Sequence, residues 1–352
     1  MRVDKKAGDA FGEPSGSDDQ PVFGEAPGAG GQPASGEPSG GEAPAVLGGP
    51  SGGEAAGRPG RRGGAATAEG GAGAVTEHKP GRAGRNLRAA VGVGLILGGI
   101  ALVTLFTVKA TFLLYVGLIV GAALWELSHA LSTRDIHLPL IPVVIGGIAM
   151  VTLAYWTATK WSVTALGLSA IGVLAFRLRG TASGYVRDVT AGLFALAYLP
   201  LMAVFVALML AEPDGARRAL IFLVLTVCSD TGAYLSGILV GKHPMAPSIS
   251  PKKTWEGLSG SIVACLAAGA IMVPGLLHGQ LWQGLVLGLA GVGAATLGDL
   301  SESMMKRDLE IKDMGHLLPG HGGILDRIDS LLVMAPVIWL LLAVFVPNGH
   351  AA

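Results

Sequence analysis

Long apolar runs separated by short polar segments fill the chain from residue 86 to residue 347. A membrane-spanning helix needs about 20 consecutive, mostly apolar residues. Runs of about this length are found at 88–107, 111–131, 138–156, 161–178, 188–211, 218–240, 257–277, 281–301 and 331–347. The pattern predicts an all-α polytopic membrane protein, a bundle of about nine transmembrane helices.

The first 85 residues differ in composition from the rest of the chain. They are mainly Gly, Pro, Ala, Glu and Ser, with few large apolar side chains. Such a segment cannot bury enough apolar area to offset the entropy lost on ordering. We therefore predict a disordered cytoplasmic tail at 1–85, a transmembrane domain at 86–347 with its most specific part at 225–330, and a short C-terminal tail at 348–352.

Composition and cysteine usage exclude several classes of protein. Of the 352 residues, 51% are hydrophobic and 14% are charged, and the formal net charge is zero. A neutral chain lacks the basic surface of a general nucleic-acid-binding protein. Cys228 and Cys265 lie in apolar runs without CxxC or Cys/His spacing, so we expect neither a disulfide framework nor a zinc site.

Lysine and arginine are distributed unevenly between the two sets of alternating loops. Basic residues in short loops mark the cytoplasmic side of a membrane protein. With a cytoplasmic N-terminus, that side carries Arg134, Arg177, Arg179, Arg187, Lys242, Lys252, Lys253, Lys306, Arg307, Lys312 and Arg327. The opposite side carries only Lys109, Lys160, Arg217 and Arg218. We therefore expect the N-terminus inside and the C-terminus outside, with the polar loops 241–256 and 302–330 both on the cytoplasmic face.

One carboxylate stands within a predicted span. Asp230 lies near the middle of the apolar stretch LVLTVCSDTGAYLSGILVG. Ionisable residues inside spans are costly, and their default interpretation is functional. Ser229, Thr231 and Tyr234 add polar groups to the same region, so we assign Asp230 to a substrate site. A structural acceptor for neighbouring donors is the alternative.

The loop after this span, GKHPMAPSISPKKTWEG, combines prolines with lysines and hydroxyl side chains. Proline interrupts helices and restricts the backbone, and ammonium and hydroxyl groups bind phosphate. We expect a shaped loop whose phosphate-binding residues are Ser250, Lys252, Lys253 and Thr254. An ordinary basic loop against anionic lipid head groups is the alternative.

Three further aspartates lie near the predicted cytoplasmic boundary. Asp299 follows an apolar run, beside Glu302 and Lys306, which fit a solvated i,i+4 pair. Asp326 and Asp329 are three residues apart, so they share a helix face and can hold a hard cation such as Mg²⁺. Carboxylates for Mg²⁺ together with nearby cations for phosphate predict phosphoryl or nucleotidyl transfer.

His321 stands in PGHGG, where glycines let the backbone turn and approach a ligand closely. Its side chain can donate to a phosphate or act as an acid. A structural role for this loop histidine stays open beside these two.

The segment from Ser303 to Asp329, SMMKRDLEIKDMGHLLPGHGGILDRID, resembles the signature of the phosphatidate cytidylyltransferases, also called CDP-diacylglycerol synthases. The matching positions are Ser303, Met305, Lys306, Arg307, Lys312, Asp313, Gly315, Pro319, His321, Gly322, Gly323, Ile324, Asp326, Arg327 and Asp329. The earlier block SDTGAYLSGILVGKHPMAPSISPKKTWEG is also similar to that family. The resemblance covers about residues 190–347, reaches the first spans only by hydropathy, and does not extend to the tail.

The resemblance implies transfer of CMP from CTP to phosphatidate, which gives CDP-diacylglycerol and pyrophosphate in a Mg²⁺-dependent step of phospholipid biosynthesis. It implies a metal cluster of Asp299, Asp326 and Asp329, with Ser303 as a further ligand and a second cation left open. Lys306 and His321 complete the expected catalytic set. The expected substrate-binding residues are Lys252, Lys253, Thr254, Ser250, Arg307, Lys312, Arg327, Gly322, Gly323 and Asp230.

Two other functions explain parts of the pattern. A CTP-dependent kinase of a polyprenol or other lipid alcohol would transfer the γ-phosphate instead. An ion-coupled transporter would need only Asp230 and the multi-span bundle, and leaves the polar loop 302–330 unexplained. We expect CTP, phosphatidate and membrane lipid as partners, no nucleic acid, and a location in the cell (inner) membrane with a cavity open to the inner leaflet; formation of a homodimer is left open.

Overall fold

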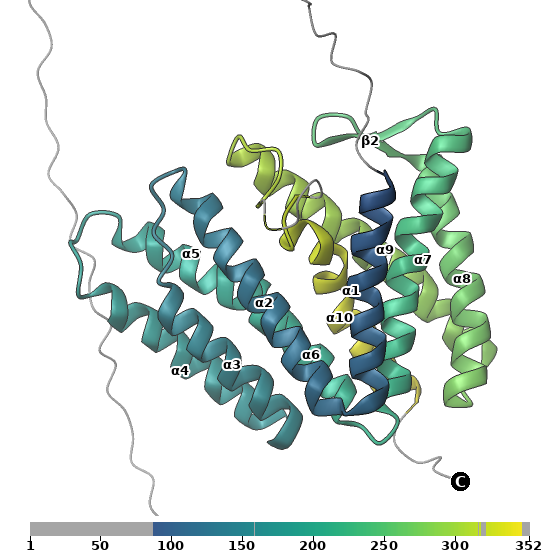
Figure 1. Cartoon of the computed structure of the whole chain (residues 1–352), viewed down its shortest axis with the longest axis horizontal. Coiled ribbons are helices and arrows are strands. Elements are labelled where there is room, and N and C mark those ends of the chain that lie inside the picture. The colour runs from purple at the N-terminus through teal and green to yellow at the C-terminus, as the bar shows by residue number, and fades with distance from the viewer. Residues whose placement is uncertain (1–86, 158, 316, 318–321, 347–352) are drawn as a thin grey trace, which may run out of the picture. The chain divides into compact units, whose positions relative to one another are not determined.

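The computed structural model describes residues 87–157, 159–315, 317 and 322–346. These residues all belong to one compact unit, Glu77–Ala352. They form a bundle of α-helices with one small antiparallel sheet (Figure 1). The predicted all-α class is confirmed for this part of the chain, and the predicted tails at 1–85 and 348–352 lie outside it.

The helices and strands follow one another in a simple order, with the sheet between the seventh and eighth helices. They are α1 (Leu87–Thr107), α2 (Lys109–Ser132), α3 (Leu140–Thr157), α4 (Thr159–Arg177), α5 (Tyr185–Tyr198), α6 (Pro200–Ala211), α7 (Gly215–Val240), β1 (Pro244–Ala246), β2 (Ser250–Thr254), α8 (Trp255–Leu277), α9 (Leu281–Asp308) and α10 (Leu325–Phe345).

The described helices confirm a polytopic membrane protein. By length and composition, seven segments are able to cross a membrane: α2, α3, the joined α5 and α6, α7, α8, α9 and α10. The predicted span 88–107 contains a shorter apolar helix, Gly92–Thr107, within the residues searched. The predicted span 161–178 coincides with α4, which is not among the seven.

The predicted span 188–211 is one apolar segment but two helices. α5 ends at Tyr198 and α6 begins at Pro200. Because proline has no amide hydrogen, Pro200 cannot donate to the carbonyl oxygen of Leu196 four residues earlier. The backbone turns at Leu199, with φ −108° and ψ −70°, and the helix starts again.

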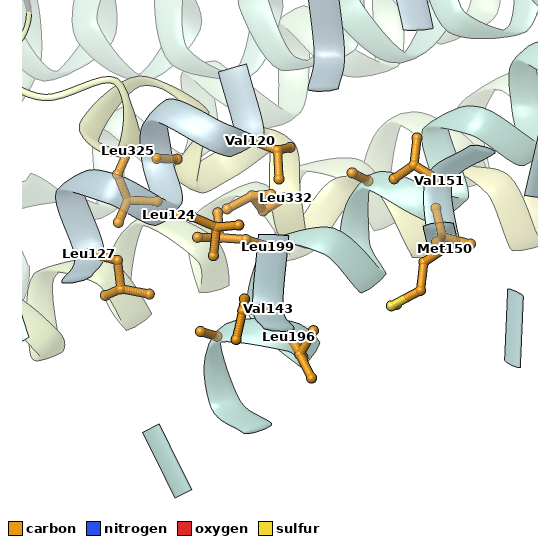
Figure 2. Packing of buried hydrophobic residues seen from close by; sticks show 14 of the residues in the cluster. Val120, Leu124, Leu127, Val143, Met150, Val151, Leu196, Leu199, Leu325 and Leu332 are labelled. Carbon is orange, nitrogen blue, oxygen red and sulfur yellow. The ribbon is translucent and has the colours of Figure 1, made fainter. Parts of the chain in front are cut away.

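Two clusters of buried apolar side chains hold the bundle together. One includes residues of every helix from α2 to α6 and of the start of α10, and Figure 2 shows Leu325 of α10 and Leu124 of α2 among its side chains. The other joins α7, α8, α9 and the rest of α10 to α1 and α6. Lipid is itself apolar, so contact between closely packed helices contributes more to such a bundle than transfer from water.

Glycines let neighbouring helices of the second cluster approach closely. A Cβ on Gly232 of α7 would lie 2.7 Å from the carbonyl oxygen of Gly260 of α8. A Cβ on Gly269 of α8 would overlap the carbonyl oxygen of Gly284 of α9. α8 is therefore held against α7 and α9 by close backbone contact as well as by side-chain packing.

Three arginines join the predicted cytoplasmic loops to one another at one end of the bundle. Each donates from its guanidinium group to a backbone carbonyl oxygen of a different loop. The donors and acceptors are Arg134 with Leu309, Arg187 with Asp135, and Arg307 with Ile249. The loops that the charge distribution assigned to one side therefore lie together.

The predicted shaped loop at 241–256 is a β-hairpin that leads directly into α8. β1 and β2 pair antiparallel, with Pro244 opposite Thr254. The Thr254 hydroxyl accepts the amide hydrogen of Gly257 at 3.1 Å and caps the first turn of α8. The hairpin therefore lies over the ends of α7 and α8 (Figure 1).

We expect Gly269→Ala to lower the melting temperature of the protein in detergent. The added methyl group overlaps the backbone of α9, and relieving such overpacking costs about 1–3 kcal/mol. Gly275→Ala in the same helix is the control, because a Cβ there meets nothing within 4 Å and alanine favours helix over glycine. Equal melting temperatures for the two variants would contradict a close α8–α9 contact.

Candidate active site

A polar cavity of about 630 Å³ lies between the hairpin and α7, α8, α9 and α10. Its wall brings together segments that are far apart in the sequence. The predicted site residues in the wall are Asp230, Ser250, Lys252, Lys253, Thr254, Asp299, Asp326, Arg327 and Asp329. The convergence expected from the topology is present at this end of the bundle.

Asp230 reaches the cavity from α7. The neighbouring residue, Ser229, faces α8, where the Ser261 hydroxyl donates to the Ser229 carbonyl oxygen at 2.7 Å. Successive helix residues point in different directions, so Asp230 is exposed while Ser229 is buried. Its carboxylate is accessible to a molecule in the cavity.

An ion pair connects the hairpin to α9 in the wall of the cavity. Lys253 Nζ lies 2.5 Å from Asp299 Oδ2, and the two side chains are 24% and 33% exposed. Lys252, the preceding residue, is exposed and lines the same cavity. The hairpin thus contributes positive charge where α9 contributes a carboxylate.

The carboxylate of Asp326 holds the first turn of α10 to the loop that precedes it. Its oxygens accept the amide hydrogens of Gly323 at 2.7 Å and Met314 at 3.1 Å. Lys306 of α9 approaches the same carboxylate at 3.0 Å and Glu302 at 2.6 Å. Lys306 therefore links α9 to α10 through two carboxylates.

Glu302 is buried, so its interpretation as half of a solvated pair is wrong. The i,i+4 ion pair with Lys306 is present, but the Glu302 side chain is only 3% exposed. Asp326 of α10 contacts Lys306 and also accepts the amide hydrogen of Met314 in the loop before α10. The spacing identified the pair correctly, and the packing of α10 on α9 removed it from solvent.

Asp329 lies one turn further along α10 and is buried against α9. A Cβ on Gly298 of α9 would lie 2.5 Å from the Asp329 carbonyl oxygen, so the two helix backbones touch at this point. Asp299 follows Gly298 directly and lines the same cavity as Asp329. This contact therefore brings two carboxylates together from separate helices.

Two glycines of the signature segment shape the backbone around carboxylates. Gly322 has φ +80°, a conformation that favours glycine, and a Cβ there would lie 2.8 Å from Asp326 Oδ2. A Cβ on Gly323 would lie 2.5 Å from Glu126 Oε2. Within the described residues, neither glycine is part of the cavity wall.

The other predicted site residues are absent from the cavity wall or lie outside the described part of the chain. Ser303 is partly buried on α9, and Lys312 is exposed in the loop after it. Arg307 is exposed and donates to the Ile249 carbonyl oxygen at 3.3 Å. His321 lies outside the residues that the structure describes.

Sequence reasoning missed Glu126 of α2. Its side chain is buried, and Oε2 accepts the amide hydrogen of Leu325 at 2.9 Å. Glu126 is an acidic residue within the apolar run GAALWELSHAL. The rule that singled out Asp230, an ionisable residue inside a span, would have identified it too.

The carboxylates have the chemistry that Mg²⁺ requires, because this ion prefers hard oxygen ligands. Asp299 and Asp329 fit such an ion best, since both line the cavity. Asp326 fits less well, because its oxygens already accept two backbone amides and pair with Lys306. Among the residues described, no three His, Cys, Asp or Glu side chains are grouped closely enough to hold a metal ion.

Several known proteins are similar to this chain over most of their length. The model of the cytidylyltransferase family matches residues 88–345. The phosphatidate cytidylyltransferase of Mycobacterium leprae is 40% identical over 285 residues, which cover 76% of this chain and 90% of the relative. The protein of that name from Staphylococcus epidermidis is 33% identical over 226 residues, which cover 62% of this chain and 86% of the relative. These matches confirm the resemblance carried by the signature segment, and the chain belongs to the cytidylyltransferase family.

Proposed function

We propose that this chain is a phosphatidate cytidylyltransferase, a nucleotidyltransferase that converts CTP and phosphatidate into CDP-diacylglycerol and pyrophosphate. The observation that carries the proposal is a polar cavity adjoining an apolar one. Asp230 and Arg327 belong to the walls of both. A water-soluble nucleotide and the head group of a lipid can therefore meet at these two residues.

The apolar cavity suits the hydrophobic part of the lipid. It has a volume of about 290 Å³ and lies among α1, α2, α6, α7 and α10. Leu97, Phe112 and Leu331 are typical of its wall. The glycerol and upper acyl chains of phosphatidate would occupy it, with the phosphate directed toward Arg327.

The polar cavity suits CTP. Lys252 and Lys253 of the hairpin supply ammonium groups for phosphate oxygens, and Thr254 adds a hydroxyl. The phosphates of CTP would therefore lie beneath the hairpin. The Gly232 and Gly260 contact holds α7 and α8 at a fixed separation below it.

The reaction needs the two phosphate groups to approach in line. A phosphate oxygen of phosphatidate attacks the α-phosphorus of CTP and forms a new P–O bond, while the bond from that phosphorus to the β-phosphate oxygen breaks and pyrophosphate leaves. Both reactants are anionic, so the barrier falls when cations hold them together. Lys252, Lys253 and Arg327 line the polar cavity and would supply this positive charge.

Asp299 and Asp329 are the residues that would hold Mg²⁺. The ion, when bound, would neutralise charge on the phosphate oxygens. We assign Asp326, predicted from its spacing as a third ligand, to the positioning of α10, because its contacts are with Lys306 and two backbone amides. Lys253 pairs with Asp299. Its ammonium group would therefore lie near a phosphate bound to the Mg²⁺ that Asp299 holds.

The proposal sets the hairpin end of the bundle on the cytoplasmic side of the inner membrane. CTP is available there, and the arginine-rich loops lie together at this end. The N-terminus would then be cytoplasmic and the C-terminus outside, as the charge distribution predicts.

Membranes containing the protein should transfer label from CTP labelled at the α-phosphorus into a chloroform-soluble product when phosphatidate and Mg²⁺ are present. CTP labelled at the γ-phosphorus should leave its label in water as pyrophosphate. Lipid-soluble label from the γ-phosphorus alone would identify a lipid-alcohol kinase instead. Absence of lipid-soluble label from both would contradict the proposal.

Asp329→Asn should lower kcat by about a hundredfold or more, because it removes a carboxylate that would hold the Mg²⁺ needed to neutralise the phosphate oxygens. Asp308→Asn is the matched control, since Asp308 is an exposed acid at the end of α9. Initial rates of CDP-diacylglycerol formation would be compared for purified variants of equal monodispersity. Unchanged turnover of Asp329→Asn would remove this carboxylate from the mechanism.

Gly98→Leu should raise the KM for phosphatidate about tenfold, which corresponds to about 1.4 kcal/mol of lost binding, while the KM for CTP stays unchanged. Gly98 lines the apolar cavity, and a Cβ there meets nothing within 4 Å, so the new side chain occupies cavity space without a clash. Gly99→Leu is the control, because Gly99 is equally open and not part of that wall. Identical KM values for phosphatidate in the two variants would show that the lipid binds elsewhere.

A further inference from the structure

Glu126 is a buried carboxylate outside the wall of the polar cavity. It lies on α2, and its side chain is almost fully buried. Burying a carboxylate among apolar helices is costly unless the group makes compensating contacts. An apolar residue would fill the space at a lower free-energy cost. The role of Glu126 should therefore lie in the contacts that its carboxylate makes.

The carboxylate of Glu126 binds the backbone near the end of the signature segment, Ser303 to Asp329. Oε2 accepts the amide hydrogen of Leu325, the first residue of α10, at 2.9 Å. The amides of the first helical turn have no partner within the helix. Glu126 of α2 therefore accepts an amide hydrogen that has no acceptor within α10.

Two glycines leave room for this carboxylate. A Cβ on Gly323 would lie 2.5 Å from Glu126 Oε2, and a Cβ on Gly315 would overlap Oε1 and the carbons beside it. Gly315, in the middle of the loop before α10, and Gly323, near its end, therefore both lie against the same side chain. Oε1 has no hydrogen-bond partner among the described residues.

The turn that follows α2 contacts the start of this loop. Arg134, two residues beyond the end of α2, donates to the Leu309 carbonyl oxygen at 3.4 Å and pairs with Glu310 at 2.8 Å. Leu325 and Leu124 of α2 belong to the same buried cluster (Figure 2). α2 and the turn that follows it thus contact both the start and the end of the segment between α9 and α10.

We propose that Glu126 is a positioning residue for the active site. By accepting the Leu325 amide and filling the space beside Gly315 and Gly323, it sets the first turn of α10. That turn carries Asp326 and Arg327, which line the polar cavity. The anchoring itself is independent of the reaction, whereas its effect on the rate of CMP transfer rests on the proposed function.

The test compares Glu126→Leu with Glu126→Gln in the full-length protein. Leucine fills similar space without an acceptor, and glutamine keeps an oxygen for the Leu325 amide. Hydrogen exchange in peptides covering 309–330 should accelerate about tenfold or more in Glu126→Leu and stay near wild type in Glu126→Gln. The kcat for CDP-diacylglycerol formation should fall about a hundredfold in Glu126→Leu, as expected for catalytic groups misplaced by about 1 Å.

A second pair of variants tests the contact with Gly315. Gly315→Ala should slow turnover and accelerate exchange in the wild-type background, and should have little further effect when Glu126 is already alanine, because the clash is then absent. Gly121→Ala on α2 is the control, because a Cβ there meets nothing within 4 Å. The comparison of the Gly315→Ala effect in the two backgrounds tests the contact even if one of the single variants is poorly stable.

The exchange and activity measurements separate two kinds of failure. If wild-type protein transfers no CMP, the proposed function fails, and the exchange data still decide whether Glu126 anchors α10. If Glu126→Leu exchanges and turns over like wild type, the positioning role is overturned. Equal impairment of Glu126→Leu and Glu126→Gln would overturn it also, because the acceptor would then not be the property that matters.

Discussion

Charged side chains inside this apolar bundle depend on partners supplied by other helices, because an isolated ion in a poorly hydrated environment is strongly destabilising. Lys306 illustrates the constraint, since its ammonium group lies between the carboxylates of Glu302 and Asp326. Lys253 and Asp299 form a second such pair between the hairpin and α9. The contacts that make the charges tolerable are therefore the contacts that join the helix ends around the site.

Backbone proximity adds the precision that charge pairing alone does not provide. At Gly298 the backbones of α9 and α10 touch, which brings Asp299 and Asp329 to one cavity. At Gly315 and Gly323 the loop closes on Glu126 of α2. In each case the absence of a Cβ lets a carboxylate or a carbonyl oxygen occupy space that any other residue would fill. The glycines of the signature segment that the structure describes therefore serve packing around carboxylates.

The meeting of two chemically different cavities gives the bundle its capacity for a reaction between a nucleotide and a lipid. One cavity lies beneath a basic hairpin, and the other lies among apolar side chains of five helices. Asp230 and Arg327 stand where the two adjoin. An interfacial enzyme needs such a junction, because a charged head group cannot enter an apolar cavity and acyl chains do not favour an aqueous one.

The sequence by itself determined the helical class, the approximate helix positions, the loops that share one end and most residues of the candidate site. These follow from local properties, namely the length of apolar runs, the distribution of lysine and arginine, and short motifs with fixed spacing. The hairpin and the break at Pro200 were less visible, because a basic loop and a continuous apolar run mask them. Only the tertiary structure decided that Glu302 is buried, that Gly298 brings Asp299 to Asp329, and that Glu126 holds α10. The Glu126 contact joins residues 199 positions apart, and no local pattern records which distant helix will supply the partner of a buried charge.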